Sequence, residues 1–444
     1  MTSFSFVVLS LILSLHLCAG QTPAVGTNKR LICYYDSQSY LRPGFAEMKL
    51  SFLKTAAEFC THLIYGYADL NDDLFEISSL NVDLDMFYYK EIISLKTEFP
   101  NLRIYLSIGG DHDNGQYDAG KYLKFLESGK DKQNTFIETA IHLLKKNDFD
   151  GLDLAFKLPT NKPRKVHSEL GMLWKKFKKL FTGDFIVDPD ADLHKQQYTE
   201  FVENLSGVFR NANLSLTMTV LPNVNSTWYF DVSEIYKNFE YINLFAFDFL
   251  TPLRNPEEAD YTAPIYLRDE ENRLPHYNVE YQVNYWLNHD CPPNKLNLGI
   301  ATYGRAWKLS SKSGISGKPI IHETLGPAEA GLQSNISGLL SWPEICSKLT
   351  NTGGTGYKGA DAPVRKVQDL EQSYGNYAFR PADDNDEHGL WISFDDPDFA
   401  GVKTNFLKSK HMGGVALYDL SYDDFRGLCT GAKFPILRSV RGHL

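Results

Sequence analysis

The chain has 444 residues, of which 43% are hydrophobic and 23% are charged, a composition that is typical of a folded globular protein and excludes a disordered chain. Its 45 basic and 55 acidic residues leave a formal net charge of −10, and such an acidic balance argues against general nucleic-acid binding. The length exceeds that of a usual single domain, but one large α/β barrel with an insertion fits as well as two domains.

Residues 1–20 read MTSFSFVVLSLILSLHLCAG and predict a secretory signal peptide, because an apolar run of suitable length ends in small residues. We expect cleavage after Gly20. No later apolar stretch approaches the roughly 20 residues that span a bilayer, so the sequence predicts no membrane span. A secreted, extracellular protein is therefore expected.

The cysteine content fits this compartment. Cys18 would leave with the signal peptide, and the remaining cysteines predict two disulfide bonds and one unpaired thiol in an oxidising environment. Their spacing alone leaves the pairing open. These residues are Cys33, Cys60, Cys291, Cys346 and Cys429.

Four sequons predict N-linked glycosylation, at Asn204, Asn213, Asn225 and Asn335. Asn225 is the strongest candidate, because it has Thr as the third sequon residue and lies in a polar loop. Asn213 is the weakest, because it opens an apolar strand. The sequence leaves open which of them carry glycans.

Eight short runs rich in β-branched and aromatic residues recur along the chain, and most are separated by amphipathic segments such as residues 136–146. They read RLICYYDS, THLIYGYADL, LRIYLSIGG, FDGLDLAF, LSLTMTVLP, YINLFAFDF, LNLGIATYGRAW and GGVALYDL. This order predicts an α/β fold, a (β/α)₈ TIM barrel formed by residues 21–307 and 390–444. The near-continuous apolar character of the runs suits strands buried on both faces.

An insertion at about residues 160–195 follows the fourth run. Within it, residues 170–181 place apolar side chains on one helical stripe and Lys175, Lys176, Lys178 and Lys179 around the other side. The lysine face is either the solvated side of a helix held at the barrel rim or a docking site for an acidic partner or polysaccharide. We favour the solvated face, because a charged face needs no partner.

A second insertion follows the seventh run. Residues 308–389 are rich in Gly, Ser and Pro, contain no long helical pattern and include short extended pieces. We expect them to form a small α+β lobe inserted into the barrel.

The fourth run carries the most informative motif, FDGLDLAFKLP at residues 149–159. Alternate strand positions share a face, so residues 153, 155 and 157 are expected to point toward the mouth of the barrel, where TIM-barrel enzymes react. Carboxylates at this spacing are typical of a catalytic set. Ala155 and Lys157 instead occupy its last two positions.

The order of the strands and their motifs resembles glycoside hydrolase family 18, the chitinases and chitinase-like lectins, over nearly the whole chain after residue 20. In active members the fourth-strand motif reads D-G-x-D-x-D-x-E. The resemblance implies that the Glu protonates the glycosidic oxygen and that the adjacent Asp orients the substrate acetamide, which attacks the sugar carbon. An ammonium group at Lys157 is a poor general acid at neutral pH, and Ala155 removes a carboxylate, so we predict no hydrolase activity.

Three further matches carry the resemblance. Residues 106–110, LSIGG, are similar to the third-strand S-x-G-G signature, but Asp111 stands where a tryptophan often follows. At the sixth-strand motif M-x-Y-D, this chain has Phe247 in place of the tyrosine and retains the aspartate as Asp248. Tyr418 occupies the position of the sugar-stacking tryptophan on the last strand. These departures weaken the prediction that the chain grips chitin.

The candidate carbohydrate cleft consists of aromatic residues near strand ends together with the position after the third strand. Aromatic faces bind sugar rings, although packing inside the barrel explains the tyrosines equally well. These residues are Tyr34, Tyr67, Asp111, Tyr303 and Tyr418.

The degenerate catalytic site comprises the fourth-strand residues and the two sixth-strand residues. A lone buried ammonium is costly, so we predict that Lys157 points into the barrel mouth and forms an ion pair with Asp153 or Asp248. The complete set is Asp150, Asp153, Ala155, Lys157, Phe247 and Asp248.

A family 18 barrel with a lost acid and an insertion after the fourth strand resembles the insect imaginal disc growth factors. This resemblance implies a secreted glycoprotein that promotes cell proliferation and motility together with insulin-type signals. It also implies that Cys33 pairs with Cys60 and Cys346 with Cys429, which leaves Cys291 unpaired. No metal or cofactor is expected, because histidines and cysteines show no ligand spacing.

Three functions remain open at this point. A signalling protein without enzymatic activity comes first, a lectin for chitin or another oligosaccharide second, and an active chitinase third. The expected partners are a cell-surface receptor or another extracellular protein, and the expected state is a monomer.

Overall fold

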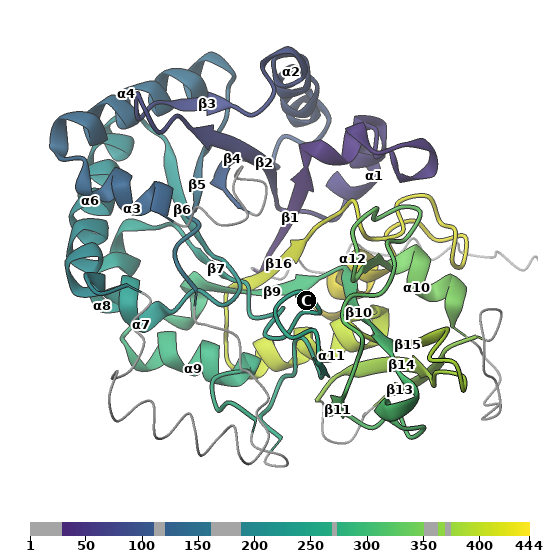
Figure 1. Ribbon diagram of the computed structural model, residues 1–444. Helices are drawn as coiled ribbons and strands as arrows, with labels where there is room; N and C mark the ends of the chain where they lie inside the picture. Colours follow the sequence, from purple (N-terminus) through teal and green to yellow (C-terminus); the bar gives the residue numbers. More distant parts are fainter. Residues whose placement is uncertain (1–28, 111–119, 161–187, 269–272, 350–362, 369–373) are drawn as a thin grey trace, which may run out of the picture.

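Eight parallel strands close into a barrel (Figure 1), in the order β1-β16-β9-β7-β6-β5-β4-β2, with β1 also paired to β2. The computed structural model describes residues 29–110, 120–160, 188–268, 273–349, 363–368 and 374–444. The barrel strands are β1 (Arg30–Asp36), β2 (His62–Leu70), β4 (Arg103–Gly109), β5 (Gly151–Ala155), β6 (Ser215–Val220), β7 (Ile242–Leu244), β9 (Leu296–Ala301) and β16 (Gly414–Tyr418). Each of the eight apolar runs contributes one of them, so the predicted TIM barrel is confirmed.

Helices surround the barrel (Figure 1). On α4, the stripe predicted within residues 136–146 is buried through Phe136, Ile137, Ala140 and Leu144. The helices of this layer are α1 (Leu53–Ala57), α2 (Val82–Glu98), α3 (Gly120–Glu127), α4 (Lys130–Lys146), α6 (Ala191–Asn211), α7 (Ser226–Tyr229), α8 (Val232–Ile235), α9 (Val279–Asn288), α11 (Pro397–Ser409) and α12 (Pro435–His443). No helix within the described ranges is both long and apolar enough to cross a membrane.

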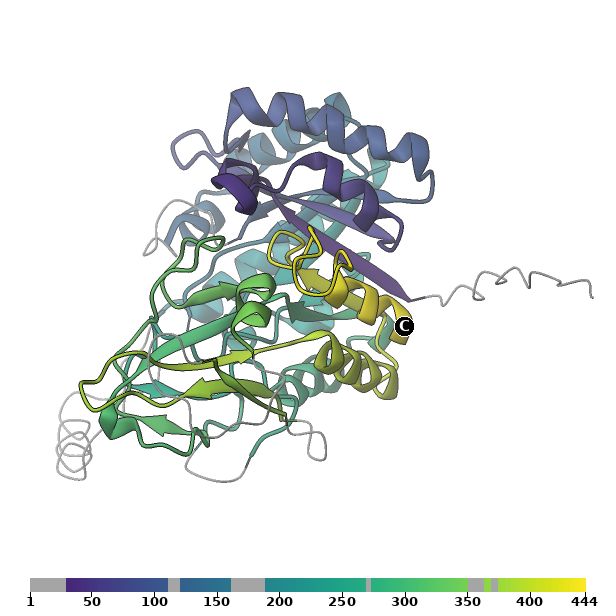
Figure 2. The same ribbon diagram turned by 90° about the vertical axis from the view of Figure 1, so that its right-hand side faces the viewer.

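A smaller antiparallel sheet lies beside the barrel (Figure 2), in the order β12-β10-β15-β14-β13. Its elements are β10 (Tyr303–Leu309), β12 (Leu339–Ser341), β13 (Arg365–Gln368), β14 (Asn376–Arg380), β15 (Gly389–Phe394) and the helix α10 (Trp342–Lys348). Three short strands form two further antiparallel pairings. β3 (Ile77–Ser79) pairs with β2, and β8 (Glu258–Ala259) pairs with β11 (Ile321–His322).

The lobe sheet extends beyond the predicted limits of 308–389 at both ends. The run LNLGIATYGRAW is not one strand: it contains β9 of the barrel and, after Thr302 alone, β10 of the lobe. The apolar pattern is continuous across this crossing, so periodicity alone does not mark the change of sheet. We propose that the lobe comprises residues 303–394.

Two disulfide bonds join distant parts of the chain. Cys33 of β1 is bonded to Cys60, and Cys346 of α10 is bonded to Cys429 near the C-terminus, which are the pairs that the resemblance implies. Cys291 is buried and free, and burial raises the pKa of its thiol to about 12. The thiol is therefore protonated and unreactive at neutral pH.

His62 makes the fold sensitive to acid. Its ring is 8% exposed and packs against Tyr105 and Tyr241, with ring centroids 5.8 and 5.1 Å away, and burial lowers its pKa from 6.5 to about 4. The unfolded chain therefore binds the proton more readily than the folded one. Stability from this residue is present above pH 6.5 and is lost as the pH falls toward 4.

We expect the His62→Gln variant to lose this pH dependence. Between pH 7 and pH 4, the free energy of unfolding of the unchanged chain should fall by about 3 kcal/mol more than that of the variant. The measurement is denaturant unfolding of both proteins at several pH values, so that titration of other groups cancels. Parallel curves for the two proteins over this range would contradict the assignment.

Candidate active site

The Asp153 carboxylate lies inside the barrel and is surrounded by hydroxyl groups. It is fully buried and accepts hydrogen bonds of 2.8 Å from Ser107 Oγ of β4 and from Thr217 Oγ1 of β6. The Thr219 hydroxyl is also within hydrogen-bond distance of both carboxylate oxygens, at 2.8 and 3.0 Å. The inward faces of three adjacent strands thus hold one acidic group.

A chain of hydrogen bonds leads to this carboxylate from the opposite end of the barrel. Arg30 Nε donates to Asn297 Oδ1 at 3.0 Å, and Asn297 Nδ2 donates to Asn243 Oδ1 at 2.9 Å. Asn243 Nδ2 donates to the Tyr34 hydroxyl at 2.7 Å, which lies 2.6 Å from the Thr219 hydroxyl. Because Thr219 donates to the carboxylate, Tyr34 must donate to Thr219, and every bond in the chain runs in the same direction.

Burial raises the pKa of Asp153, and the hydroxyl donors act in the opposite direction. An ionised carboxylate without a positive partner is costly in a low-dielectric interior. Each donated hydrogen bond stabilises the ionised form and offsets part of that cost. The site can therefore hold a carboxyl group, but it contains no second acid on β5.

The predicted ion pair of Lys157 is wrong. Within the described residues, no salt bridge joins its ammonium to Asp153 or to Asp248, and its side chain is half-buried. Asp248 pairs instead with Arg305, whose Nε lies 2.9 Å from Oδ1, and accepts a 2.7 Å hydrogen bond from the Tyr303 hydroxyl. Hydroxyl donors and an arginine from the lobe strand β10 therefore satisfy the two carboxylates.

Ala155 ends β5 in a tightly packed position. Its side chain is fully buried, and its carbonyl accepts a 2.9 Å hydrogen bond from the Gly110 amide. Gly110 has a φ of +70°, and a Cβ there would lie 2.4 Å from the Tyr67 ring, so this close approach requires glycine. The position where the family resemblance implies a carboxylate thus carries only a methyl group.

Asp150 lies at the opposite end of β5 from the barrel mouth. Its carboxylate accepts a 2.7 Å hydrogen bond from the Ile104 amide and pairs with Lys96 at 3.0 Å. These contacts connect β5 to β4 and α2. Asp150 therefore has a structural role and does not extend the acidic site.

The tyrosines of the candidate carbohydrate cleft are packed together. Tyr34, Tyr303 and Tyr418 are 1%, 4% and 6% exposed, and Phe247 is 1% exposed. The Tyr418 ring lies between Tyr34 and Phe247, with ring centroids 5.7 and 6.1 Å away. These contacts leave little ring surface for a sugar.

Two predicted features lie outside the described residues. They are Asp111 and the basic segment of residues 170–181. The expected loss of stacking at Asp111 and the two interpretations of the lysine face therefore remain predictions.

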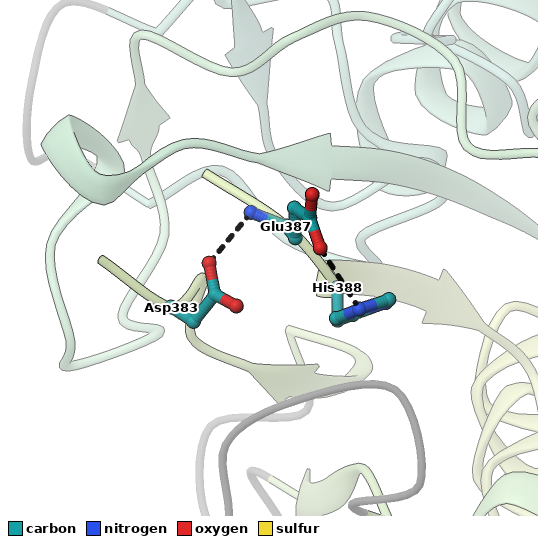
Figure 3. A group of neighbouring side chains, drawn as sticks. All are labelled: Asp383, Glu387 and His388. Atoms are coloured by element: carbon teal, nitrogen blue, oxygen red, sulfur yellow. Dashed lines mark hydrogen bonds and ion pairs between the residues drawn. The ribbon is translucent and has the colours of Figure 1, made fainter. Parts of the chain in front are cut away.

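One group in the lobe has the composition of a metal site (Figure 3). Oxygen or nitrogen atoms of Asp383, Glu387 and His388 all lie within 4.8 Å of one another. The Asp383 carboxylate, however, accepts hydrogen bonds from the backbone amides of Asn385 and Glu387, at 2.9 and 2.8 Å. These contacts close the turn between β14 and β15, which is sufficient to explain the cluster.

The four sequons lie in different settings. Asn204 on α6, Asn213 before β6 and Asn335 in the lobe are exposed, whereas Asn225 is half-buried. Asn213 occupies a turn with a φ of +60°. All four remain predictions as glycosylation sites.

Sequence reasoning missed the polar residues that hold Asp153. They stand singly or in alternation within apolar strands, where a polar side chain must face the barrel interior. This alternation is the signal that identifies them, because each inward polar group requires a partner. The residues are Arg30, Ser107, Thr217, Thr219, Asn243 and Asn297.

The comparisons with known proteins agree with this geometry. Residues 30–423 match Glycosyl hydrolases family 18. The chain is 87% identical, over all of both chains, to the chitinase-like protein Idgf1 of Glossina morsitans morsitans. It also resembles catalytic domain 2 of the group II chitinase of Ostrinia furnacalis, with 25% identity, a TM-score of 0.76 and coverage of 94% and 97% of the two chains.

A second similar structure, human YKL-39, is described as a pseudo-chitinase with retained chitooligosaccharide binding properties. It is 23% identical, with a TM-score of 0.73 and coverage of 94% and 99% of the two chains, so the likeness supports the fold alone. The family match and the Idgf1 relative carry the assignment. The chain belongs to glycosyl hydrolase family 18, as a chitinase-like member of the imaginal disc growth factor family.

Proposed function

We propose that this protein is a secreted glycoprotein without hydrolase activity that acts as a growth factor, promoting cell proliferation and motility together with insulin-type signals. The observation that carries the loss of hydrolysis is the half-buried Lys157, two residues after the end of β5, where the resemblance implies the general acid of active members. The signalling role is supported by similarity to the imaginal disc growth factors. A receptor or another extracellular protein is the proposed partner.

Electrostatics at this position also oppose glycoside hydrolysis. The transition state carries positive charge on the sugar ring, which the Lys157 ammonium disfavours. Ala155 leaves no carboxylate to orient the acetamide, and Phe247 lacks the hydroxyl of the tyrosine that the family motif has at this position. Asp153 alone cannot supply these groups, because it is fully buried within the hydroxyl cluster.

Oligosaccharide binding is the second proposed function. A protein with the same fold, human YKL-39, is described as a pseudo-chitinase with retained chitooligosaccharide binding properties, so such binding is compatible with this fold. The burial of Tyr34, Tyr303 and Tyr418 argues against a similar grip here. Calorimetric titration with a chitooligosaccharide is expected to show no binding, and measurable affinity would favour the lectin instead.

The growth-factor proposal is tested on cultured insect cells. Purified protein, with an insulin-type peptide present, is expected to raise DNA synthesis and migration above the level reached with the peptide alone. Lys157→Gln is the matched variant: it removes the charge from a residue outside both carboxylate clusters, so it should keep the response. No response from the unchanged protein would contradict the proposal.

A further inference from the structure

A hollow of about 470 Å³ lies at the carboxyl ends of β6 and β7, between the short helix α7 and helix α9. Trp228 of α7 faces it from one side, and Tyr281 and Tyr285 of α9 from the other. Its size lies within the range of about 300–1,000 Å³ that is usual for small-molecule sites. Aromatic walls of this kind bind sugar rings through their apolar faces.

Two polar atoms at the hollow have no partner. The Ser226 hydroxyl, on a residue that is 6% exposed, and Asn223 Oδ1 are both buried and form no hydrogen bond within the described part of the chain. Both residues line the hollow. A buried polar group without a partner carries a free-energy cost, and a ligand with hydroxyl or amide groups removes it. A polar occupant that also stacks on aromatic rings is therefore favoured.

Asn225, the first residue of the strongest sequon, lines the same hollow. The Thr227 hydroxyl lies 2.6 Å from Asn225 Oδ1, and its backbone amide donates to the same oxygen at 3.0 Å. These bonds fix the plane of the Asn225 amide, to whose nitrogen an N-linked glycan attaches. Trp228 follows directly in the chain, so the first sugar would lie within reach of the aromatic wall.

We propose that Asn225 carries an N-linked glycan whose first N-acetylglucosamine residues lie in this hollow, against Trp228, Tyr281 and Tyr285. On the nascent chain, a bond forms between Asn225 Nδ2 and sugar C1 as the amide loses a proton. The C1–O bond to a lipid-linked diphosphate breaks, and the diphosphate leaves with the bonding electrons. The inference rests on passage through the secretory pathway, which the proposed function includes.

The seated glycan should resist enzymatic release. The full chain is secreted from insect cells, and both native and unfolded samples are treated with a peptide N-glycosidase that accepts the attached glycans. Release of the glycan at each sequon is followed by glycopeptide mass spectrometry. At Asn225 we expect release from the native protein to be at least tenfold slower than after unfolding. Asn335 is the matched control, because it is exposed in the lobe, and its ratio should be close to one.

Trp228→Ala keeps the sequon and removes one wall, so native release at Asn225 should rise toward the control. Tyr281→Ala, at a residue that is 44% exposed, is a second variant that disturbs the fold less and should act in the same direction. An unmodified Asn225, or release as fast from native as from unfolded protein, would overturn the inference. If no sequon is modified, the secreted-glycoprotein proposal fails as well.

A free sugar could fill the hollow in place of the attached one. Asn225→Gln leaves the walls intact, and N,N′-diacetylchitobiose is then added while the tryptophan and tyrosine NMR signals are followed. Saturable shifts in this variant, and none in the glycosylated protein, are expected for a site that its own glycan occupies. Equal shifts in both proteins would show that the hollow is open, which rules out the seated glycan.

Discussion

Replacing Ala155 by Asp and Lys157 by Glu is expected to give slow hydrolysis of a short chitooligosaccharide, where the unchanged protein gives none. The Glu restores a proton donor, a contribution of about 10²- to 10⁴-fold in rate. The Asp restores a carboxylate on the same face of β5 as Asp153. Two buried carboxylates this close raise the pKa of one of them, which favours sharing of a proton between them.

The gain should remain small because the barrel mouth is packed with aromatic side chains. Binding energy from remote sugars helps to orient the reacting ring, so a cleft that grips weakly loses rate as well as affinity. Adding Phe247→Tyr restores one hydroxyl and should raise turnover further. Tyr418→Trp is less suited, because Tyr418 is only 6% exposed and overpacking costs about 1–3 kcal/mol.

Product release is measured by chromatography of chitooligosaccharide digests. The matched control carries Ala155→Asn and Lys157→Gln, which have similar shapes but no carboxyl group, and it should be inactive. Thermal unfolding checks that each variant is folded. Robust turnover by the unchanged protein would overturn the proposed loss of hydrolysis, and robust turnover by the double variant would show that the mouth still binds chitin.

Removing Lys403 is expected to destabilise the protein by about 3–5 kcal/mol, because it leaves a buried charge without its partner. Lys403 of α11 is completely buried, and its ammonium lies 2.5 Å from the Asp395 carboxylate, on a residue that is 6% exposed. Burial raises the pKa of Asp395, and Lys403 opposes this effect. In Lys403→Met the carboxyl should therefore take up a proton more readily, and the loss should shrink in acid.

Denaturant unfolding of three variants, each compared with the unchanged protein, separates the charge effect from packing. Lys403→Met combined with Asp395→Leu removes both charges and should recover much of the loss. The surface control is Lys237→Met, whose partner Glu234 lies 3.2 Å away with both side chains more than half exposed. This variant should change the free energy of unfolding by less than about 1 kcal/mol. Equal losses for Lys403→Met and Lys237→Met would contradict the buried-pair argument.

The barrel could be predicted from the sequence because its strands are apolar on both faces and alternate with helical patterns. The boundary of the lobe could not, because β9 and β10 are separated by Thr302 alone and read as one apolar run. Local periodicity reports whether a segment is extended. It does not report which sheet the segment joins.

The motif on β5 predicted the missing acid, since this depends only on which residues stand at positions 155 and 157. The partners of the acids were less predictable. Lys157 was the nearest cation in the sequence to Asp153, but hydroxyl groups from the two neighbouring strands β4 and β6 hold Asp153, and Arg305 from the lobe pairs with Asp248. Such partners meet only after folding, and no spacing along the chain encodes them.

The hydrogen-bond chain from Arg30 to Asp153 restricts which parts of the old active site can change one at a time. Replacing any single member leaves a neighbouring donor or acceptor buried without a partner, at a cost of about 1–3 kcal/mol. Lys157 lies outside the chain and is half-buried, so its position can change without that penalty. Asp153 thus persists as part of the barrel's internal framework, and its presence in a chain of this kind is not a sign that the chain can cut chitin.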